Sequence, residues 1–199
     1  MAHDNAFLQR VLQRLPSSNV TSFHFEKWDA GRPTQEGFGL LPISNVDPEA
    51  LIASVMDVDN YTGNIDHVEE SRSVTDSRFV PPEKVRFYQK ISIPVLGSIQ
   101  MESVLIDAGE LEGFRVAYWE MLEPETESLN KRQGIRSQYN NGAWLVKPGF
   151  VGYALSSAPR RDDVGFIKWK ALTKGADVGA SSVIRNNIEG MARWSRQRS

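Results

Sequence analysis

The chain has 199 residues, of which 40% are hydrophobic and 24% are charged, so it is long enough to bury one globular core. Its 23 basic and 25 acidic side chains give a net charge of −2, which argues against a general nucleic-acid binder, since such proteins carry a surplus of Lys and Arg that replaces counterions on phosphates. The absence of cysteine excludes disulfides, thiolate zinc sites and cysteine nucleophiles.

The first predicted element is an amphipathic helix over residues 5–15, which Pro16 ends. Its apolar residues recur at helical spacing: Phe7, Leu8, Val11, Leu12 and Leu15. We expect this helix to dock on the main domain; the alternative is a helix that binds a partner or a membrane surface. The domain organisation predicted is therefore an N-terminal helix with its linker over residues 1–20, followed by one domain over residues 21–199.

Strand and helix patterns alternate over the next fifty residues. Residues 21–28 alternate in hydrophobicity as an edge strand does, and residues 38–43 form the first strand within the sheet. A helix begins at Asp47, a capping residue that is followed by Pro at the first helical position. This helix is predicted to end near Met56, and residues 68–75 form the next strand.

The centre of the chain, residues 85–122, predicts three consecutive strands joined by turns at residues 94–97 and 107–113. Alternation gives the first two strands one apolar face each. The residues on these faces are Val85, Phe87, Ile91 and Ile93, then Ile99, Met101 and Leu105. The third strand carries an aromatic and a charged residue on both faces, so its pattern leaves the inward face open.

Residues 123–131 are polar and predict a loop. Two strand segments follow around Asn140-Asn141-Gly142, where the Asn-Gly step either forms a tight hairpin turn or marks a bulge in one long strand. Residues 150–156 predict the last strand.

The clearest helix is the final one, predicted from residue 178 to about residue 197 with Asp177 as its N-cap. At 100° per residue, its apolar residues fall on one side: Ala180, Val183, Ile184, Ile188, Met191 and Trp194. Asn187 interrupts this stripe near its centre. A buried amide needs a hydrogen-bond partner, either within the protein or on a ligand.

Two segments of this order carry a family resemblance. ISNVDPEALIASVMDVDNYTGNIDHVEESRSV resembles the opening of START-like, polyketide-cyclase-type domains of the SRPBCC superfamily, which have a strand, a short helix, and then an Asp and an aromatic before the next strand. NGAWLVKPGFVGYALSSAP resembles their G-x-W-x-x-x-P segment, which leads into a strand with V-x-Y. The matching residues here are Gly142, Trp144, Pro148, Val151 and Tyr153. The resemblance spans roughly residues 38–198 and implies an α+β helix-grip fold of the START/Bet v 1 type, in which a curved antiparallel sheet wraps around a long C-terminal helix.

Such domains hold an apolar ligand between the sheet and the helix. The resemblance therefore implies that this chain binds, and in the carrier members transports, a hydrophobic or amphipathic small molecule such as a lipid or a polyketide-like compound, with no cofactor. Two alternatives stay open: a polyketide cyclase or aromatase that uses the same cavity, and an interaction module without a cavity. The residues predicted to line the cavity are Phe87, Met101, Trp119, Trp144, Tyr153, Ile184, Asn187, Ile188 and Met191.

Metal and nucleophile chemistry find little support in the sequence. An iron site of two His and one carboxylate would need His24 and His67 together, and the predicted elements keep them apart, so no metal site is expected. A Ser-His-Asp triad lacks support as well, because the G-x-S-x-G motif that presents a nucleophilic serine does not occur in the sequence. The alternative for His67 is an acid–base pair with the adjacent Asp66. Neighbours in a strand face opposite sides, so we interpret His67 as a surface residue instead. Catalytic residues stay unassigned, and binding is favoured over catalysis.

Location follows from what the sequence lacks. The N-terminus has no continuous apolar run of the signal-peptide kind, and no apolar stretch approaches the ~20 residues of a membrane-spanning helix. The absence of cysteine fits a reducing compartment. We therefore expect a cytoplasmic protein that binds no nucleic acid, has no integral membrane segment and contacts membranes transiently at most.

Overall fold

A computed structural model describes residues 5–17, 20–93 and 97–198. These residues form one eight-stranded sheet in the order β1-β2-β8-β7-β6-β5-β4-β3, antiparallel except for a short parallel pairing between β5 and β7. The strands are β1 (His24–Trp28), β2 (Glu36–Pro42), β3 (Val68–Ser73), β4 (Lys84–Ile93), β5 (Gly97–Leu111), β6 (Phe114–Met121), β7 (Ile135–Lys147) and β8 (Phe150–Pro159). The helices are α1 (Ala6–Leu12), α2 (Pro48–Met56), the 3-10 turn η1 (Val58–Asn60), α3 (Glu123–Ser128), α4 (Arg161–Val164) and α5 (Phe166–Arg198).

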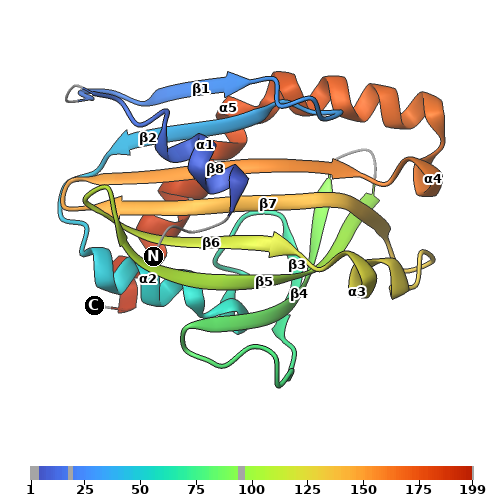
Figure 1. Cartoon of the computed structure of the whole chain (residues 1–199), viewed down its shortest axis with the longest axis horizontal. Coiled ribbons are helices and arrows are strands. Elements are labelled where there is room, and N and C mark those ends of the chain that lie inside the picture. The colour runs from blue at the N-terminus through green and yellow to red at the C-terminus, as the bar shows by residue number, and fades with distance from the viewer. Residues whose placement is uncertain (1–4, 18–19, 94–96, 199) are drawn as a thin grey trace.

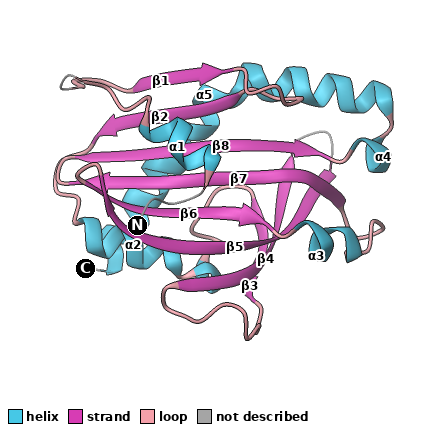
Figure 2. Cartoon of the chain, viewed as in Figure 1, coloured by secondary structure: helices cyan, strands magenta, loops and turns pink. Residues whose placement is uncertain are grey.

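The predicted helix-grip arrangement is confirmed. The sheet curves, and the long helix α5 crosses behind it, while the short helix α1 lies in front (Figure 1). Figure 2 shows α2 beside the C-terminal end of α5 at one edge of the sheet. The capping prediction for α2 is also confirmed, because the Asp47 carboxylate accepts hydrogen bonds from the backbone N–H of Glu49 and Ala50.

The N-terminal helix α1 docks on the outer face of the sheet, the face away from α5. Phe7, Leu8 and Val11 are buried there against the sheet, in one apolar cluster with Phe38 and Leu145. Polar contacts fix the same helix. Arg10 forms a bidentate ion pair with Glu36 at 2.6 and 2.8 Å, and Trp28 donates to the same carboxylate at 2.7 Å.

The position of α1 explains why the pattern of β6 is ambiguous. Val116 and Tyr118 belong to the apolar cluster under α1, whereas Ala117 and Trp119 pack with the core on the α5 side. Both faces of β6 therefore contribute to apolar clusters. Alternation cannot mark an inward face on a strand that is buried on both sides.

Two predicted connections are wrong in extent. Strand β5 continues to Leu111, with a bulge between Asp107 and Gly109, and the turn after it is limited to Glu112 and Gly113, both at positive φ. The polar segment after β6 is not a loop throughout, because it contains the helix α3. That helix has Pro in its first turn together with two acidic residues, which is a helix-start signature within a polar composition.

The Asn-Gly step lies within one long strand, so the hairpin alternative is wrong. Strand β7 runs through Gly142 without a break, and its bulge lies between Ser137 and Tyr139 instead. Gly142 is opposite Trp119 on β6, and a Cβ at this position would be 2.0 Å from Cζ2 of the Trp119 ring. The glycine is needed here for space and not for a turn.

The final helix is longer than predicted. It begins at Phe166, directly after Gly165 at φ 77°, so Asp177 lies inside the helix and is not its N-cap. The first turns lack a one-sided apolar pattern because they do not face the core: Phe166 is 53% and Ile167 is 84% exposed. Within the described ranges, no helix combines the length and the apolarity needed to cross a membrane.

Candidate ligand-binding pocket

Helix α5 touches the sheet tightly on one side only. It packs against β2, β8 and α2. At β2, two glycines admit the side chain of Ile184: a Cβ on Gly39 would lie 2.5 Å from Cγ2 of Ile184, and a Cβ on Gly37 would lie 2.9 Å from its Cδ1. The helix is thus seated close to β2, and the sheet curves away from it toward β4 and β5.

The space left between α5 and the curved sheet is a pocket of about 630 Å³. This volume lies within the roughly 300–1,000 Å³ of small-molecule sites. Its apolar wall comes from β4, β5, β6, β7, β8 and α5. The larger residues of this wall are Phe87, Ile91, Ile93, Ile99, Met101, Leu105, Trp119, Trp144, Tyr153, Leu155, Ile184 and Met191.

Three aromatic rings form a contiguous part of the wall. Trp144 and Tyr153 are cross-strand partners on β7 and β8 with ring centroids 4.5 Å apart, and the Trp119 ring lies 5.7 Å from Tyr153. Trp119 donates its indole N–H to Asn140, whose amide donates to Ser157 at 3.1 Å. The indole N–H of Trp119 is therefore satisfied within the protein.

The other two rings carry polar atoms without such partners. Over the described residues, neither Nε1 of Trp144 nor Oη of Tyr153 has a hydrogen-bond partner, although the two side chains are only 5% and 7% exposed. Burial raises the pKa of the Tyr153 phenol, so it stays protonated and able to donate. Neither atom is among the fully enclosed side-chain atoms that lack a partner in the described structure, so both face the open space of the pocket and are available to a ligand.

Two half-buried amides on the pocket wall are also unpaired. Asn187 on α5 and Gln89 on β4 line the pocket, and neither has a hydrogen-bond partner in the described part of the chain. Asn187 is the polar interruption of the apolar stripe, and its amide finds no hydrogen-bond partner among the described residues. Gln89 was not predicted, although it shares the inward face of β4 with Phe87 and Ile91 by simple alternation.

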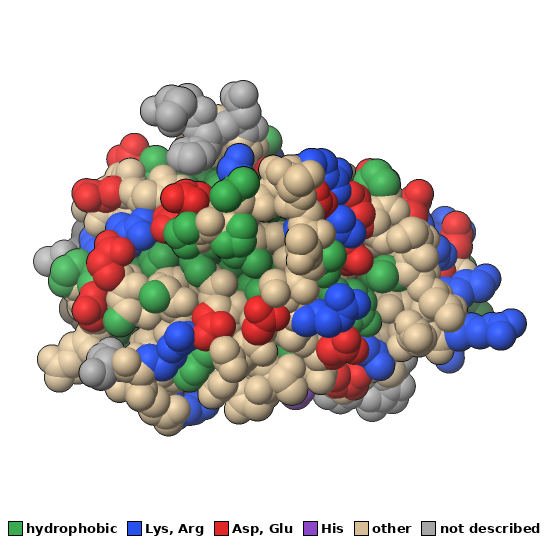
Figure 3. Space-filling view, turned by 90° about the horizontal axis from the view of Figure 1, so that it is seen from below, with side chains coloured by type: hydrophobic (Ala, Val, Ile, Leu, Met, Phe, Trp, Pro, Cys, Tyr) green, Lys and Arg blue, Asp and Glu red, His purple; other side chains and the backbone are tan. Residues whose placement is uncertain are grey.

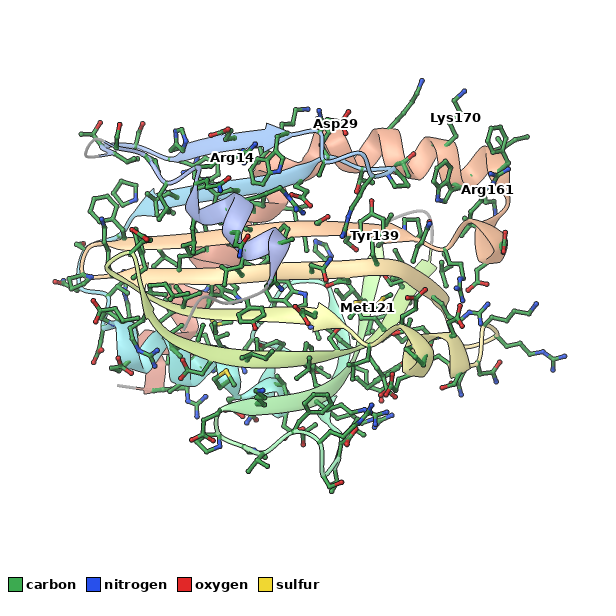
Figure 4. All side chains as sticks on the ribbon, in the orientation of Figure 1. Arg14, Asp29, Met121, Tyr139, Arg161 and Lys170 are labelled. Carbon is green, nitrogen blue, oxygen red and sulfur yellow. The ribbon has the colours of Figure 1, made fainter. Side chains whose placement is uncertain are left out.

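One part of the pocket wall comes from the loop between β1 and β2. Thr34 lines the pocket and is held by Tyr139 of β7, which is labelled in Figure 4: Oη of Tyr139 accepts from the Thr34 N–H at 3.1 Å. The Thr34 hydroxyl donates to the carbonyl of Ser157 at 2.9 Å. Arg32 stacks over the Tyr139 ring with 4.8 Å between guanidinium carbon and ring centroid. These contacts fix a loop whose role in the wall has no sequence signature.

Asp66 and His67 lie at the solvent-facing edge of the pocket. Both residues line it and both are exposed, which confirms His67 as a surface residue. His67 adopts a positive φ of 67°, and its carbonyl accepts from the N–H of Ser92 at 2.8 Å. His24 is on β1 and does not line this pocket. Among the residues that the structure describes, no three His, Asp or Glu side chains are grouped as a metal site.

The structure brings the residues predicted for the cavity together, with one exception. Phe87, Met101 and Trp119 line the pocket, as do Trp144, Tyr153, Ile184, Asn187 and Met191. Ile188 is fully buried in the core cluster between α5 and the sheet and is not part of the pocket wall. Its position on the same helix stripe could not distinguish a core contact from a wall contact.

Comparison with known proteins identifies the class of fold. No family model matches the chain, and no curated protein matches it in sequence. Among solved structures, it is similar to a STAR-related lipid transfer protein from Xanthomonas axonopodis (13% identity, TM-score 0.70, 91% of this chain and 97% of that one). It is also similar to human StAR-related lipid transfer protein 5 (8%, 0.66, 96% and 94%) and to the ZhuI aromatase/cyclase from Streptomyces sp. R1128 (11%, 0.52, 88% and 96%). The fold is START-like. At these identities the similarity establishes the fold alone.

Proposed function

We propose that this protein binds a hydrophobic or amphipathic small molecule, such as a lipid, in the pocket between the sheet and α5, and carries it. The observation that supports this most strongly is the mainly apolar pocket of about 630 Å³ between the sheet and α5. Protein interiors are close-packed, and an apolar space of this size leaves its wall without partner atoms. An apolar ligand supplies those contacts and gains ~25 cal/mol for each Å² of its own surface that leaves water.

The structural neighbours support the same class of ligand. Two of them are described as lipid transfer proteins, and a third as an aromatase/cyclase. A carrier needs only the pocket, whereas a cyclase also needs groups that act on the ligand. The two roles therefore differ in what happens to the ligand. A carrier releases it chemically unchanged, whereas a cyclase converts it.

Displacement of an apolar, environment-sensitive dye tests the proposal. We expect the dye to bind with one saturable site and long-chain lipids or polycyclic compounds to displace it. The variant Gly179→Leu should weaken this binding. Gly179 lines the pocket on α5, and a Cβ there meets no atom within 4 Å, so leucine fills pocket space without a clash. Leucine also favours the helix by about 0.5–1 kcal/mol relative to glycine.

The matched control is Ser182→Leu, an exposed position on the same helix that does not line the pocket. It should bind dye as the unmodified chain does. Equal dye binding by Gly179→Leu and Ser182→Leu, or the absence of a saturable site for any of the compounds, would contradict the proposal.

A further inference from the structure

The described wall of the pocket carries no Lys or Arg. Asp66 and His67 also line the pocket, and both lie at its exposed edge. The segments outside the described ranges contain no Lys or Arg in their sequence either. A ligand that passes this edge therefore meets no Lys or Arg side chain on the described wall.

The arginines of the sheet are engaged elsewhere. Arg86 pairs with Asp76 and Glu102, and Arg136 pairs with Asp163 at 2.7 Å. Neither arginine lines the pocket. On the surface seen from below, acidic and basic side chains are interspersed and neither sign dominates (Figure 3). Neither the wall nor this surface offers a positive field for an anionic group.

Away from the exposed edge, the pocket offers neutral polar atoms that lack hydrogen-bond partners over the described ranges. They include the indole N–H of Trp144, the hydroxyl of Tyr153 and the side-chain amides of Gln89 and Asn187. A carboxylate or phosphate that loses its water needs a cation or several donors at one point. A single hydroxyl or carbonyl group needs only one or two neutral partners, which this wall provides.

We infer that the pocket selects an uncharged amphiphile, with a hydroxyl or carbonyl as its polar group, and rejects the carboxylate, sulfate or phosphate analogue of the same molecule. Trp144, Tyr153 and Asn187 are the specificity-determining residues that hydrogen-bond this polar group. The inference rests on the proposed function, because it concerns the ligand of the same pocket.

Matched pairs of compounds test it directly. Each pair shares its apolar part and differs in charge: a long-chain primary alcohol and the fatty acid of equal length, a sterol and its sulfate, a diacylglycerol and the corresponding phosphatidic acid. Competition against the dye at neutral pH should give at least about tenfold tighter binding of the neutral member in every pair that binds, a difference of ~1.4 kcal/mol. Equal or tighter binding of the anionic members would overturn the inference and leave the proposed function standing. Failure of all six compounds and of the dye would remove the proposed function, and the inference with it.

Two variants of equal charge sharpen the test. Gln89→Lys places an ammonium group on the half-buried pocket wall, and Gln138→Lys places it at an exposed position outside the pocket. Gln89→Lys should raise the affinity for the fatty acid, relative to the affinity for the alcohol, by at least about tenfold. Gln138→Lys should leave the ratio of these two affinities unchanged. Asn187→Lys is the second wall variant if Gln89→Lys does not fold. A preference that stays the same in a folded wall variant, or that shifts equally in Gln138→Lys, would contradict selection by the charge of the wall.

Discussion

The two faces of the central sheet bury aromatic residues in different ways. On the outer face, under α1, the buried carboxylate of Glu36 is held by Arg10 and by the indole N–H of Trp28. On the inner face, toward α5, Trp144 and Tyr153 are as deeply buried as Trp28. The indole N–H and the phenol of these two residues have no hydrogen-bond partner among the residues described. A buried group that is fully paired needs nothing further, whereas an unpaired one next to open space is suited to a ligand. The comparison fits the proposal that the inner face binds a ligand, whereas the polar contacts of the outer face stabilise the fold.

Removing the ion pair on the outer face should have the largest effect on stability. In Arg10→Ala, the Glu36 carboxylate would keep its burial and lose its charged partner, so we expect unfolding to be easier by about 3 kcal/mol. Denaturant unfolding measures this loss, and ligand affinity should not change. Arg185→Ala is the control, because it removes an exposed i,i+4 pair on α5 and should cost less than about 0.5 kcal/mol. A large loss of ligand affinity in folded Arg10→Ala would contradict the claim that the outer face contributes only to stability.

Substitutions at two glycines in the paired strands β7 and β8 allow a direct comparison of the two faces. A Cβ on Gly142 would clash with the Trp119 ring, which lines the pocket, and a Cβ on Gly152 would lie 3.1 Å from Cε2 of Phe38 on the outer face. Both Gly142→Ala and Gly152→Ala should destabilise the fold, by about 1–3 kcal/mol for the first and less for the second. Only Gly142→Ala should weaken ligand binding, because it displaces a ring of the pocket wall. Thermal melts and dye titrations of both variants measure the two effects, and equal loss of affinity in both would contradict this assignment.

The smallest effect on stability should come from Asn187→Leu. Because Asn187 is half-buried and unpaired in the described structure, replacing it removes no internal hydrogen bond, and the ligand-free variant should melt at the same temperature or higher. Affinity for a neutral long-chain alcohol should fall several-fold, since one hydrogen bond is worth about 0.5–1.5 kcal/mol. The opposite pattern, lower stability with unchanged affinity, would show that Asn187 has an internal partner and no role toward the ligand.

The sequence predicted the architecture well because its strongest signals are periodic. The alternation of β4 and β5 correctly placed Phe87, Ile99 and Met101 on the inner face, and the stripe of α5 correctly placed Ile184 and Met191. These patterns indicate which face of a strand or helix is buried, so they can be read from the sequence without knowing which residues are in contact.

Features that depend on a single spatial neighbour could not be predicted. The Asn-Gly step left a hairpin turn and a bulge open, because nothing in the sequence shows that the Trp119 ring covers Gly142. Ile184 and Ile188 lie on the same apolar stripe of α5 and both belong to the core cluster, and only the packing of α5 places Ile184 on the pocket wall as well. The start of α5 was missed because its first turns face solvent, where no apolar period is required.

Native mass spectrometry of the protein purified from its own organism tests the central claim most directly. The account predicts one bound small molecule per chain, uncharged and mainly apolar, with lower occupancy in Gly179→Leu than in Ser182→Leu. A stoichiometric ligand with a carboxylate, sulfate or phosphate group would contradict the inference about charge. Purified protein that carries no small molecule, and that binds neither the dye nor any member of the matched pairs, would contradict the pocket as a binding site.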